Sequence, residues 1–209
     1  MSGTVGLDAS SVGKIMREGT IFLNLPNLIT TLRILLIPVF LIFFMTPSPI
    51  RSLWAALIFI LASATDLLDG YVARKMKLVT RFGKLLDPIA DKLLVISAVI
   101  LLVAFHRVPA ILAILLIGRE MAITGLRVIA TDQGILIPAE RLGKFKTFLQ
   151  IVSITMLILN SSLVPAIGRI DLHDLGRILL WVSLALSLTS AGQYFYRFSS
   201  QVRHRNVIS

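Results

Sequence analysis

The sequence predicts an all-α integral membrane protein with six transmembrane helices. Of its 209 residues, 56% are hydrophobic and 15% are charged, and the mean hydropathy is +0.87. Soluble domains carry about a quarter charged residues. The second observation is that apolar residues gather in six segments, most of them near the ~20 residues that span a bilayer as a helix. This composition excludes a disordered chain, a collagen-like repeat and a coiled coil.

The six segments follow one another with short connections. They are expected at residues 28–46, 52–75, 84–106, 108–131, 144–165 and 174–197. The connections contain Pro, Gly or charged residues, as in Thr46-Pro47-Ser48-Pro49. We therefore expect one six-helix domain over residues 24–200.

Polar sequences flank this domain. Residues 1–23 are predicted to be a juxtamembrane segment, in which Lys14 and Arg17 beside apolar Ile15 favour a short helix on the membrane surface. The first apolar run is too long for a signal-peptide core, so no cleaved signal is expected. Residues 201–209 are predicted to be a basic tail.

The net charge of +10 is distributed unevenly along the chain. Thirteen Lys and Arg residues fall in the two terminal segments and in the loops near 74–84 and 132–146, against four in the other loops. The positive-inside rule places both termini and these two loops in the cytoplasm of a multi-pass inner-membrane protein. No soluble domain remains to carry a nucleic-acid site. The absence of cysteine excludes disulfides and thiolate chemistry.

Four carboxylates stand near the cytoplasmic ends of the second and third segments. Asp66 and Asp69 are three residues apart, and Asp87 and Asp91 are four apart, so each pair lies on one helix face. The short connection makes the two helices antiparallel neighbours, and the four carboxylates can converge on one polar cavity. Ionisable groups at membrane depth are costly and are by default functional. A proton or cation relay in a transporter is one reading.

A divalent metal site is the other reading. Oxygen-only ligands suit Mg²⁺, Mn²⁺ or Ca²⁺, and two such ions can clamp the oxygens of a phosphoryl displacement. Small residues at Gly70 and Ala73 leave room beside the helix, and Arg74 offers a fork for an anion, or serves only as a membrane anchor. Gly83 is expected to relax the backbone before the third helix.

These residues form one continuous pattern. It reads Asp66-x2-Asp69-Gly70-x2-Ala73-Arg74-x8-Gly83-x3-Asp87-x3-Asp91. The pattern resembles the signature of the CDP-alcohol phosphotransferases. The resemblance implies a six-helix homodimer that moves a phosphatidyl group from a CDP-linked lipid to an alcohol. It also implies that the four aspartates hold two Mg²⁺ or Mn²⁺ ions and that Asp91 is the catalytic base. Under the same resemblance, the CDP site is formed by Asp66, Asp69, Gly70, Ala73, Arg74 and Gly83.

Three further segments resemble the members of this family that form phosphatidylglycerophosphate. They are 26–33, 117–127 and 142–150. The resemblance implies that CDP-diacylglycerol and sn-glycerol 3-phosphate are the substrates, and it adds Asn27, Thr30 and Arg33 to the CDP-lipid site. Asn27 and Thr30 can equally serve as a helix cap and first turn, and Arg33 can equally snorkel to the interface.

The acceptor's phosphate would explain the charges of the fourth segment. Arg119 and Arg127 are eight residues apart and share a face of an otherwise apolar helix, where guanidinium groups need anionic partners. Lys144 and Lys146 could close the pocket from the fifth helix. A structural pairing of the arginines with Glu120 or Asp132 is the alternative. Inositol phosphate, serine and phosphatidylglycerol stay open as other acceptors.

The remaining aromatic and histidine residues are assigned no chemistry. His106 and His173 are expected on the side away from the carboxylates. The aromatic residues are expected to face lipid or the interface: Phe22, Phe40, Phe43, Phe44, Trp54 and Trp181.

Overall fold

The computed structural model describes the backbone of residues 25–76, 81–132, 141–159 and 171–208. Side chains are described for residues 31–65, 92–132, 145–159 and 171–203. The described residues form six helices and no strand. These helices are α2 (Leu25–Phe44), α3 (Pro49–Met76), α4 (Arg81–Ala104), α5 (Ala110–Asp132), α6 (Arg141–Leu159) and α7 (Leu172–Ile208). The predicted juxtamembrane segment 1–23 lies outside the described residues.

Each helix corresponds to one predicted apolar segment, and most helix ends lie one to three residues from the predicted ones. α6 is described only to Leu159, six residues before the predicted end at 165. α4 begins at Arg81, so Gly83 lies in its first turn and not in the connection before it. α7 continues to Ile208, eleven residues beyond the predicted end at 197 and through most of the predicted tail. Both extensions are polar. Hydropathy marks where a helix leaves an apolar environment, whereas the backbone hydrogen bonds of the helix can continue through polar residues.

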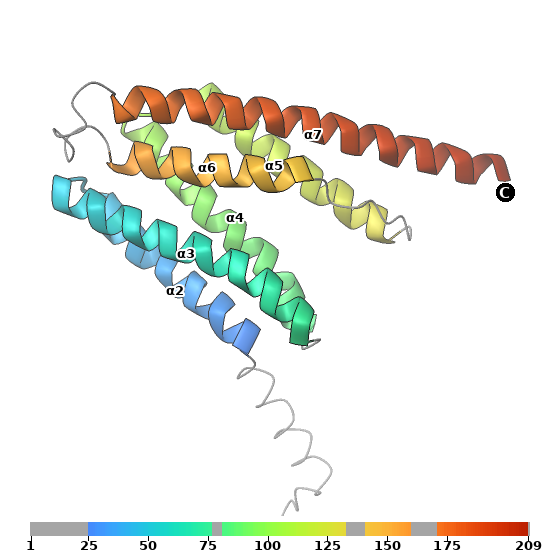
Figure 1. The fold of residues 1–209 in the computed structure, drawn as a ribbon, viewed down its shortest axis with the longest axis horizontal. Coiled ribbons are helices and arrows are strands. Elements are labelled where there is room, and N and C mark those ends of the chain that lie inside the picture. Colours follow the sequence, from blue (N-terminus) through green and yellow to red (C-terminus); the bar gives the residue numbers. More distant parts are fainter. Residues whose placement is uncertain (1–24, 77–80, 133–140, 160–170, 209) are drawn as a thin grey trace, which may run out of the picture.

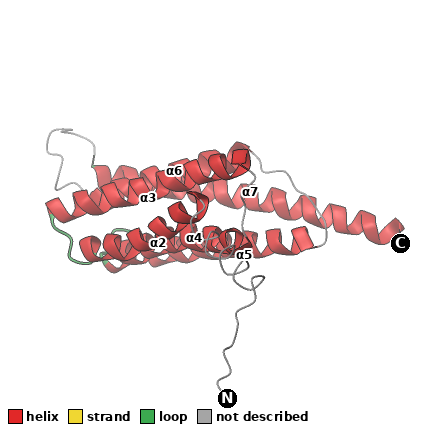
Figure 2. Cartoon of the chain, turned by 90° about the horizontal axis from the view of Figure 1, so that it is seen from below, coloured by secondary structure: helices red, strands yellow, loops and turns green. Residues whose placement is uncertain are grey.

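The helices alternate in direction from α2 to α7 and gather their ends into two groups. Figure 1 shows the end of α3, the start of α4, the end of α5 and the start of α6 on the right, with the C-terminal end of α7. The α2–α3 and α4–α5 connections lie at the opposite end. The helices run along the long axis of the molecule (Figure 2). α6 packs against α7 and α3, α2 packs against α3 and α4, and α5 packs against α7.

An aromatic cluster fills the core on the side of α2. Phe40 and Phe44 are fully buried, and the Phe40 ring lies 5.5 Å from Phe44 and 6.0 Å from Phe59 of α3. The prediction that Phe40 and Phe44 face lipid is therefore wrong. Together with buried Ile37 they are spaced three and four residues apart, which places them on the one face of α2 that meets its neighbours. Trp54 and Trp181 are exposed, as predicted.

The α4–α5 connection closes with a helix C-cap. His106 has a φ of 56°, its N–H donates to the Val103 carbonyl at 2.9 Å, and the Arg107 N–H donates to the Leu102 carbonyl at 2.9 Å. These two bonds are those of a Schellman motif, whose left-handed position normally carries Gly. The Arg107 guanidinium then donates to the carbonyls of Leu157 and Ile158 at 2.8 Å each. Burial lowers the pKa of Arg107. This arginine ties the connection to α6.

α6 and α7 approach closely at Gly176. A Cβ atom at this position would lie 3.0 Å from Leu157 Cγ and 3.3 Å from the Ser153 carbonyl oxygen. The Ser153 hydroxyl donates to the Gly176 carbonyl at 2.7 Å. Small residues and hydroxyl bonds of this kind are typical of helix pairs in membranes.

One helix of the described chain is long and apolar enough to cross a membrane by itself. It is the stretch Leu172–Arg203 of α7, with a mean hydropathy of 1.4 over its best window. Four shorter apolar stretches lie in α2, α3, α4 and α6, namely Thr31–Phe44, Pro49–Thr65, Lys92–Ala104 and Phe145–Leu159.

Candidate active site

The four aspartates lie on two helices that contact each other. Asp66 and Asp69 belong to α3, and Asp87 and Asp91 belong to α4, near the ends of these helices that Figure 1 places together. Their side chains lie outside the described residues, as do those of Gly70, Ala73, Arg74 and Gly83 of the predicted CDP site. Among the side chains that are described, no three His, Asp or Glu residues stand close enough to hold a metal ion.

A charge cluster follows directly along α4. The Lys92 ammonium, one residue after Asp91, lies 3.2 Å from Glu120 Oε1 of α5. The other carboxylate oxygen of Glu120 accepts a hydrogen bond from the Arg119 guanidinium. Arg119 is buried, at 8% exposed, and its Nε also donates to the Ser187 carbonyl of α7 at 3.1 Å. The alternative that Glu120 pairs with Arg119 is therefore confirmed as a contact.

Two more cations complete this cluster. Lys146 of α6 interacts electrostatically with Glu120, Arg119 and Lys92, and Arg127 of α5 interacts with both Arg119 and Lys146. We call Lys92, Arg119, Glu120, Arg127 and Lys146 the basic cluster. Three cations, Lys92, Arg119 and Lys146, thus surround a single described carboxylate. Arg127 adds a fourth positive charge beside two of them. Because charges at short range interact strongly in a low-dielectric interior, this surplus favours the entry of an anion.

α7 supports the basic cluster from one side. Besides the Ser187 carbonyl that accepts from Arg119, the Ser183 hydroxyl donates to the backbone carbonyl of Lys146 at 3.1 Å. The Arg127 guanidinium carbon lies 5.8 Å from the centre of the Tyr194 ring.

A small cavity adjoins the cluster. It measures about 70 Å³ and lies between α3, α4, α5 and α6. Its polar wall is formed by Ser63, Lys92, Glu120, Thr147 and Gln150. The cavity therefore connects the basic cluster with the helices that carry the aspartates.

The predicted residues of α2 and α6 are described only in part. Arg33 is 1% exposed, so its side chain does not snorkel to the surface. The backbones of Asn27 and Thr30 in α2 and of Lys144 in α6 are helical. Their side chains lie outside the described residues, and their assignments stay predictions.

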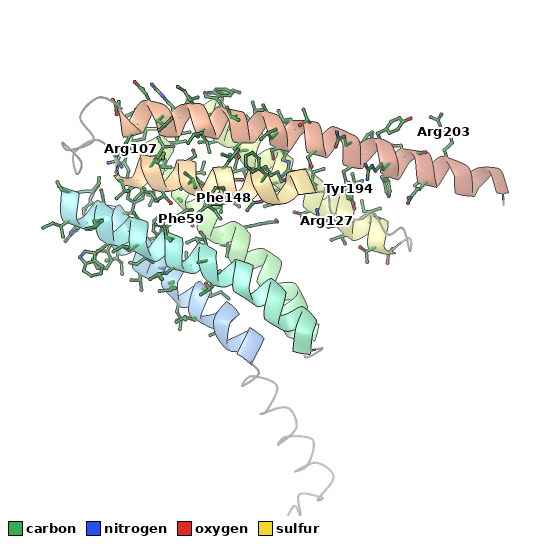
Figure 3. All side chains as sticks on the ribbon, viewed as in Figure 1. Phe59, Arg107, Arg127, Phe148, Tyr194 and Arg203 are labelled. Carbon is green, nitrogen blue, oxygen red and sulfur yellow. The ribbon has the colours of Figure 1, made fainter. Side chains whose placement is uncertain are left out.

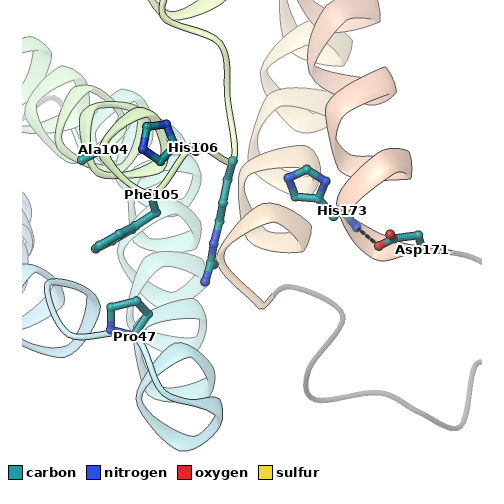
Figure 4. A pocket seen from close by; sticks show the side chains of 7 residues that line it. Pro47, Ala104, Phe105, His106, Asp171 and His173 are labelled. Atoms are coloured by element: carbon teal, nitrogen blue, oxygen red, sulfur yellow. Dashed lines mark hydrogen bonds between the residues drawn. The ribbon is translucent and has the colours of Figure 1, made fainter.

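The opposite end of the molecule carries a second pocket, of about 630 Å³. Figure 4 shows His106 at the α4–α5 connection and His173 at the start of α7, each from a different wall. The backbone N–H of His173 donates to the Asp171 carboxylate at 2.9 Å. Both histidines lie away from the aspartate helix ends, as the sequence predicts.

Comparison with known proteins identifies the family. The model of the CDP-alcohol phosphatidyltransferase family matches residues 23–189. The chain belongs to this family.

The relatives found for this chain share one name. A Bacillus subtilis protein named CDP-diacylglycerol–glycerol-3-phosphate 3-phosphatidyltransferase is 44% identical over 184 residues, which cover 82% of this chain and 93% of that protein. Proteins of the same name from Rickettsia typhi and Pseudomonas fluorescens are 42% and 39% identical over 82% of this chain, and cover 95% and 88% of their own lengths.

The sequence did not lead us to Lys92, which belongs to the basic cluster, or to Tyr194, which contacts it. Lys92 is a charge inside a predicted transmembrane segment, and the criterion that selected Arg119 would also have selected it. Tyr194 carries no such signal, because its role depends on which helix α7 packs against.

Proposed function

We propose that this phosphatidyltransferase moves the phosphatidyl group of CDP-diacylglycerol to sn-glycerol 3-phosphate, giving phosphatidylglycerophosphate and CMP. The shared name of the relatives supports this reaction. The observation that carries it is the basic cluster, where Lys92, Arg119 and Lys146 surround Glu120. Arg127 adds a fourth cation beside Lys146. An acceptor that brings its own phosphate supplies the missing negative charge. Inositol is uncharged, and serine is a zwitterion without net charge.

The cluster is suited to bind a phosphate of this kind. Arginine forks match phosphate oxygens in pairs, and lysine adds point charge. Arg119 is held on two sides before any ligand enters, by Glu120 and by the Ser187 carbonyl. A preformed site loses less side-chain entropy on binding, so more of the interaction energy remains for the substrate. Lys144, from the same helix as Lys146, is proposed to join them.

We propose that Asp66, Asp69, Asp87 and Asp91 hold two Mg²⁺ or Mn²⁺ ions. A donor set of carboxylates alone suits these hard cations, and the two helices that carry it are in contact. When bound, such ions neutralise the diphosphate of the donor lipid and stabilise the charge that develops on the departing CMP.

The chain's own residues position the two substrates and move the proton. Asp91 accepts the proton of the glycerol 1-hydroxyl, whose oxygen bonds to the phosphorus that carries diacylglycerol while the bond to CMP breaks. The basic cluster fixes the other end of the acceptor, and proximity lowers the barrier. The CDP moiety is proposed to contact Asn27, Thr30, Arg33, Gly70, Ala73, Arg74 and Gly83.

We further propose that all six helices span the inner membrane, with both termini and the active site cytoplasmic. Large apolar side chains face outward on several helices, as at Ile42, Leu61 and Ile114, which are 60–68% exposed. Lipid would cover such faces, and the acyl chains of the substrate would remain in it. A homodimer is proposed from the family resemblance.

The test of the acceptor site is the effect of Arg127→Ala on the two Michaelis constants. Loss of one phosphate contact should raise the KM for glycerol 3-phosphate about tenfold or more. The KM for CDP-diacylglycerol should stay within about twofold, because the aspartate helices are unaltered. Arg177→Ala, which removes an exposed arginine at the opposite end, is the control and should change neither value. Equal increases of both constants in Arg127→Ala would contradict the assignment.

A further inference from the structure

The register between α5 and α7 places two residues of α7 against the two arginines. Arg119 meets Ser187, and Arg127 meets Tyr194. The arginines are eight residues apart on α5, and their partners are seven apart on α7. Figure 1 shows that the two helices run in the same direction, so the paired positions advance together along one seam.

The two contacts differ in kind. Arg119 is buried and donates a hydrogen bond to the backbone carbonyl of Ser187. Any residue at position 187 that leaves the helix backbone undistorted would supply the same carbonyl. Arg127 is exposed and contacts an aromatic ring, with its guanidinium carbon 5.8 Å from the centre of the Tyr194 ring. Figure 3 labels both side chains where α5 and α7 lie together. Only this second contact depends on the identity of the α7 side chain.

An exposed arginine binds an anion more readily when its side chain is already held in place. Its side chain carries about 2 kcal/mol of rotamer entropy, which binding of a phosphate would otherwise have to overcome. A ring face attracts the guanidinium and restricts its rotamers while leaving its N–H groups at the edge available to an anion. We propose that Tyr194 is a positioning residue of the acceptor site, holding Arg127 ready for the phosphate of glycerol 3-phosphate; this rests on the proposed function. Tyr194 lies beyond residues 23–189, which match the family model.

The first experiment compares Michaelis constants of the full-length protein in detergent. Tyr194→Leu removes the ring and should raise the KM for glycerol 3-phosphate about two- to fivefold, the fold-change expected of one cation–π contact. The KM for CDP-diacylglycerol and kcat should not change. Tyr194→Phe retains the ring and should restore the wild-type KM.

A matched control lies two residues further along the helix. Tyr196 is 75% exposed and points to another face of α7, so Tyr196→Leu should leave all constants unaltered. If Tyr194→Leu does not fold, Tyr194→Gln gives the same comparison with a polar helix-forming residue. Wild-type KM values in the ring-deleted variant, or a Phe variant that behaves like the Leu variant, would overturn the proposal.

A double variant, Arg127→Ala with Tyr194→Leu, separates the positioning role of Tyr194 from the proposed acceptor site. If Tyr194 acts through Arg127, Tyr194→Leu should add nothing to the KM increase of Arg127→Ala. Additive effects would contradict the proposed link. If Arg127→Ala itself leaves the KM for glycerol 3-phosphate unchanged, then the acceptor site has been assigned wrongly, and the positioning role fails with it.

Discussion

Glu120 is the residue on which the charge balance of the basic cluster depends. It contacts Lys92 and Arg119 directly and interacts electrostatically with Lys146. Glu120→Gln would leave the neighbouring cations facing one another, and we expect it to lower the free energy of unfolding by about 1–3 kcal/mol. Inorganic phosphate should restore part of this loss, because an anion that binds only the folded state stabilises it. Thermal unfolding with and without phosphate measures both effects.

The control for this variant is a carboxylate at the other end of the molecule. Asp174 pairs with Arg177 at 2.9 Å and is 60% exposed, so Asp174→Asn makes the same change of charge in a solvated pair. Such pairs contribute about 0–1 kcal/mol. If phosphate stabilised both variants equally, the basic cluster would not be its binding site.

Among single residues, the sequence predicts those that follow a fixed spacing and those that place a charge in an apolar segment, where its burial is costly. The aspartates form a pattern of fixed spacing, and Arg119 and Arg127 are charges within an apolar segment. The Arg119–Glu120 contact could be predicted because the two are adjacent. The contacts of Arg119 with Ser187 and of Arg127 with Tyr194 span 68 and 67 residues of sequence. They depend on helix packing, which no local pattern encodes.

Among the helices, the α6–α7 pair depends most clearly on one small residue. Gly176→Ala would place a methyl group 3.0 Å from Leu157 Cγ and 3.3 Å from a backbone oxygen that cannot rotate away. We expect a loss of about 1–3 kcal/mol, as for other overpacked interiors. Gly192→Ala on the same helix meets nothing within 4 Å and should be neutral or stabilising by up to ~1 kcal/mol. Unfolding temperatures of the two variants give the comparison, and equal temperatures would contradict this account of the packing.

The length of an apolar segment predicts well that a helix is present. It predicts less well where the helix ends and which of its faces is buried. α4 and α7 extend into polar sequence, because hydropathy reports the surroundings of a helix and not its hydrogen bonds. Phe40 and Phe44 were expected to face lipid, yet they lie on the packed face of α2. In a helix that is apolar on every side, hydrophobicity does not distinguish a face that meets lipid from one that meets protein.

Over the whole molecule, the helices separate two chemically different ends. The aspartates lie in the halves of α3 and α4 that are nearer one end, and the basic cluster lies between the middle of the helices and that end. The other end holds the His106 and His173 pocket. The uneven distribution of Lys and Arg in the loops predicts this division from sequence alone. What the sequence does not encode locally is that α7 lies beside α5 and α6, on one side of the proposed acceptor site.

The most direct test of the central claim is CMP release by the purified protein from CDP-diacylglycerol and Mg²⁺. Glycerol 3-phosphate, inositol phosphate, inositol and serine are offered one at a time. The account predicts release with glycerol 3-phosphate alone, its loss when a chelator removes the metal, and no release by folded Asp91→Asn protein. Release with any of the other three acceptors, or release that persists in the chelator, would contradict it.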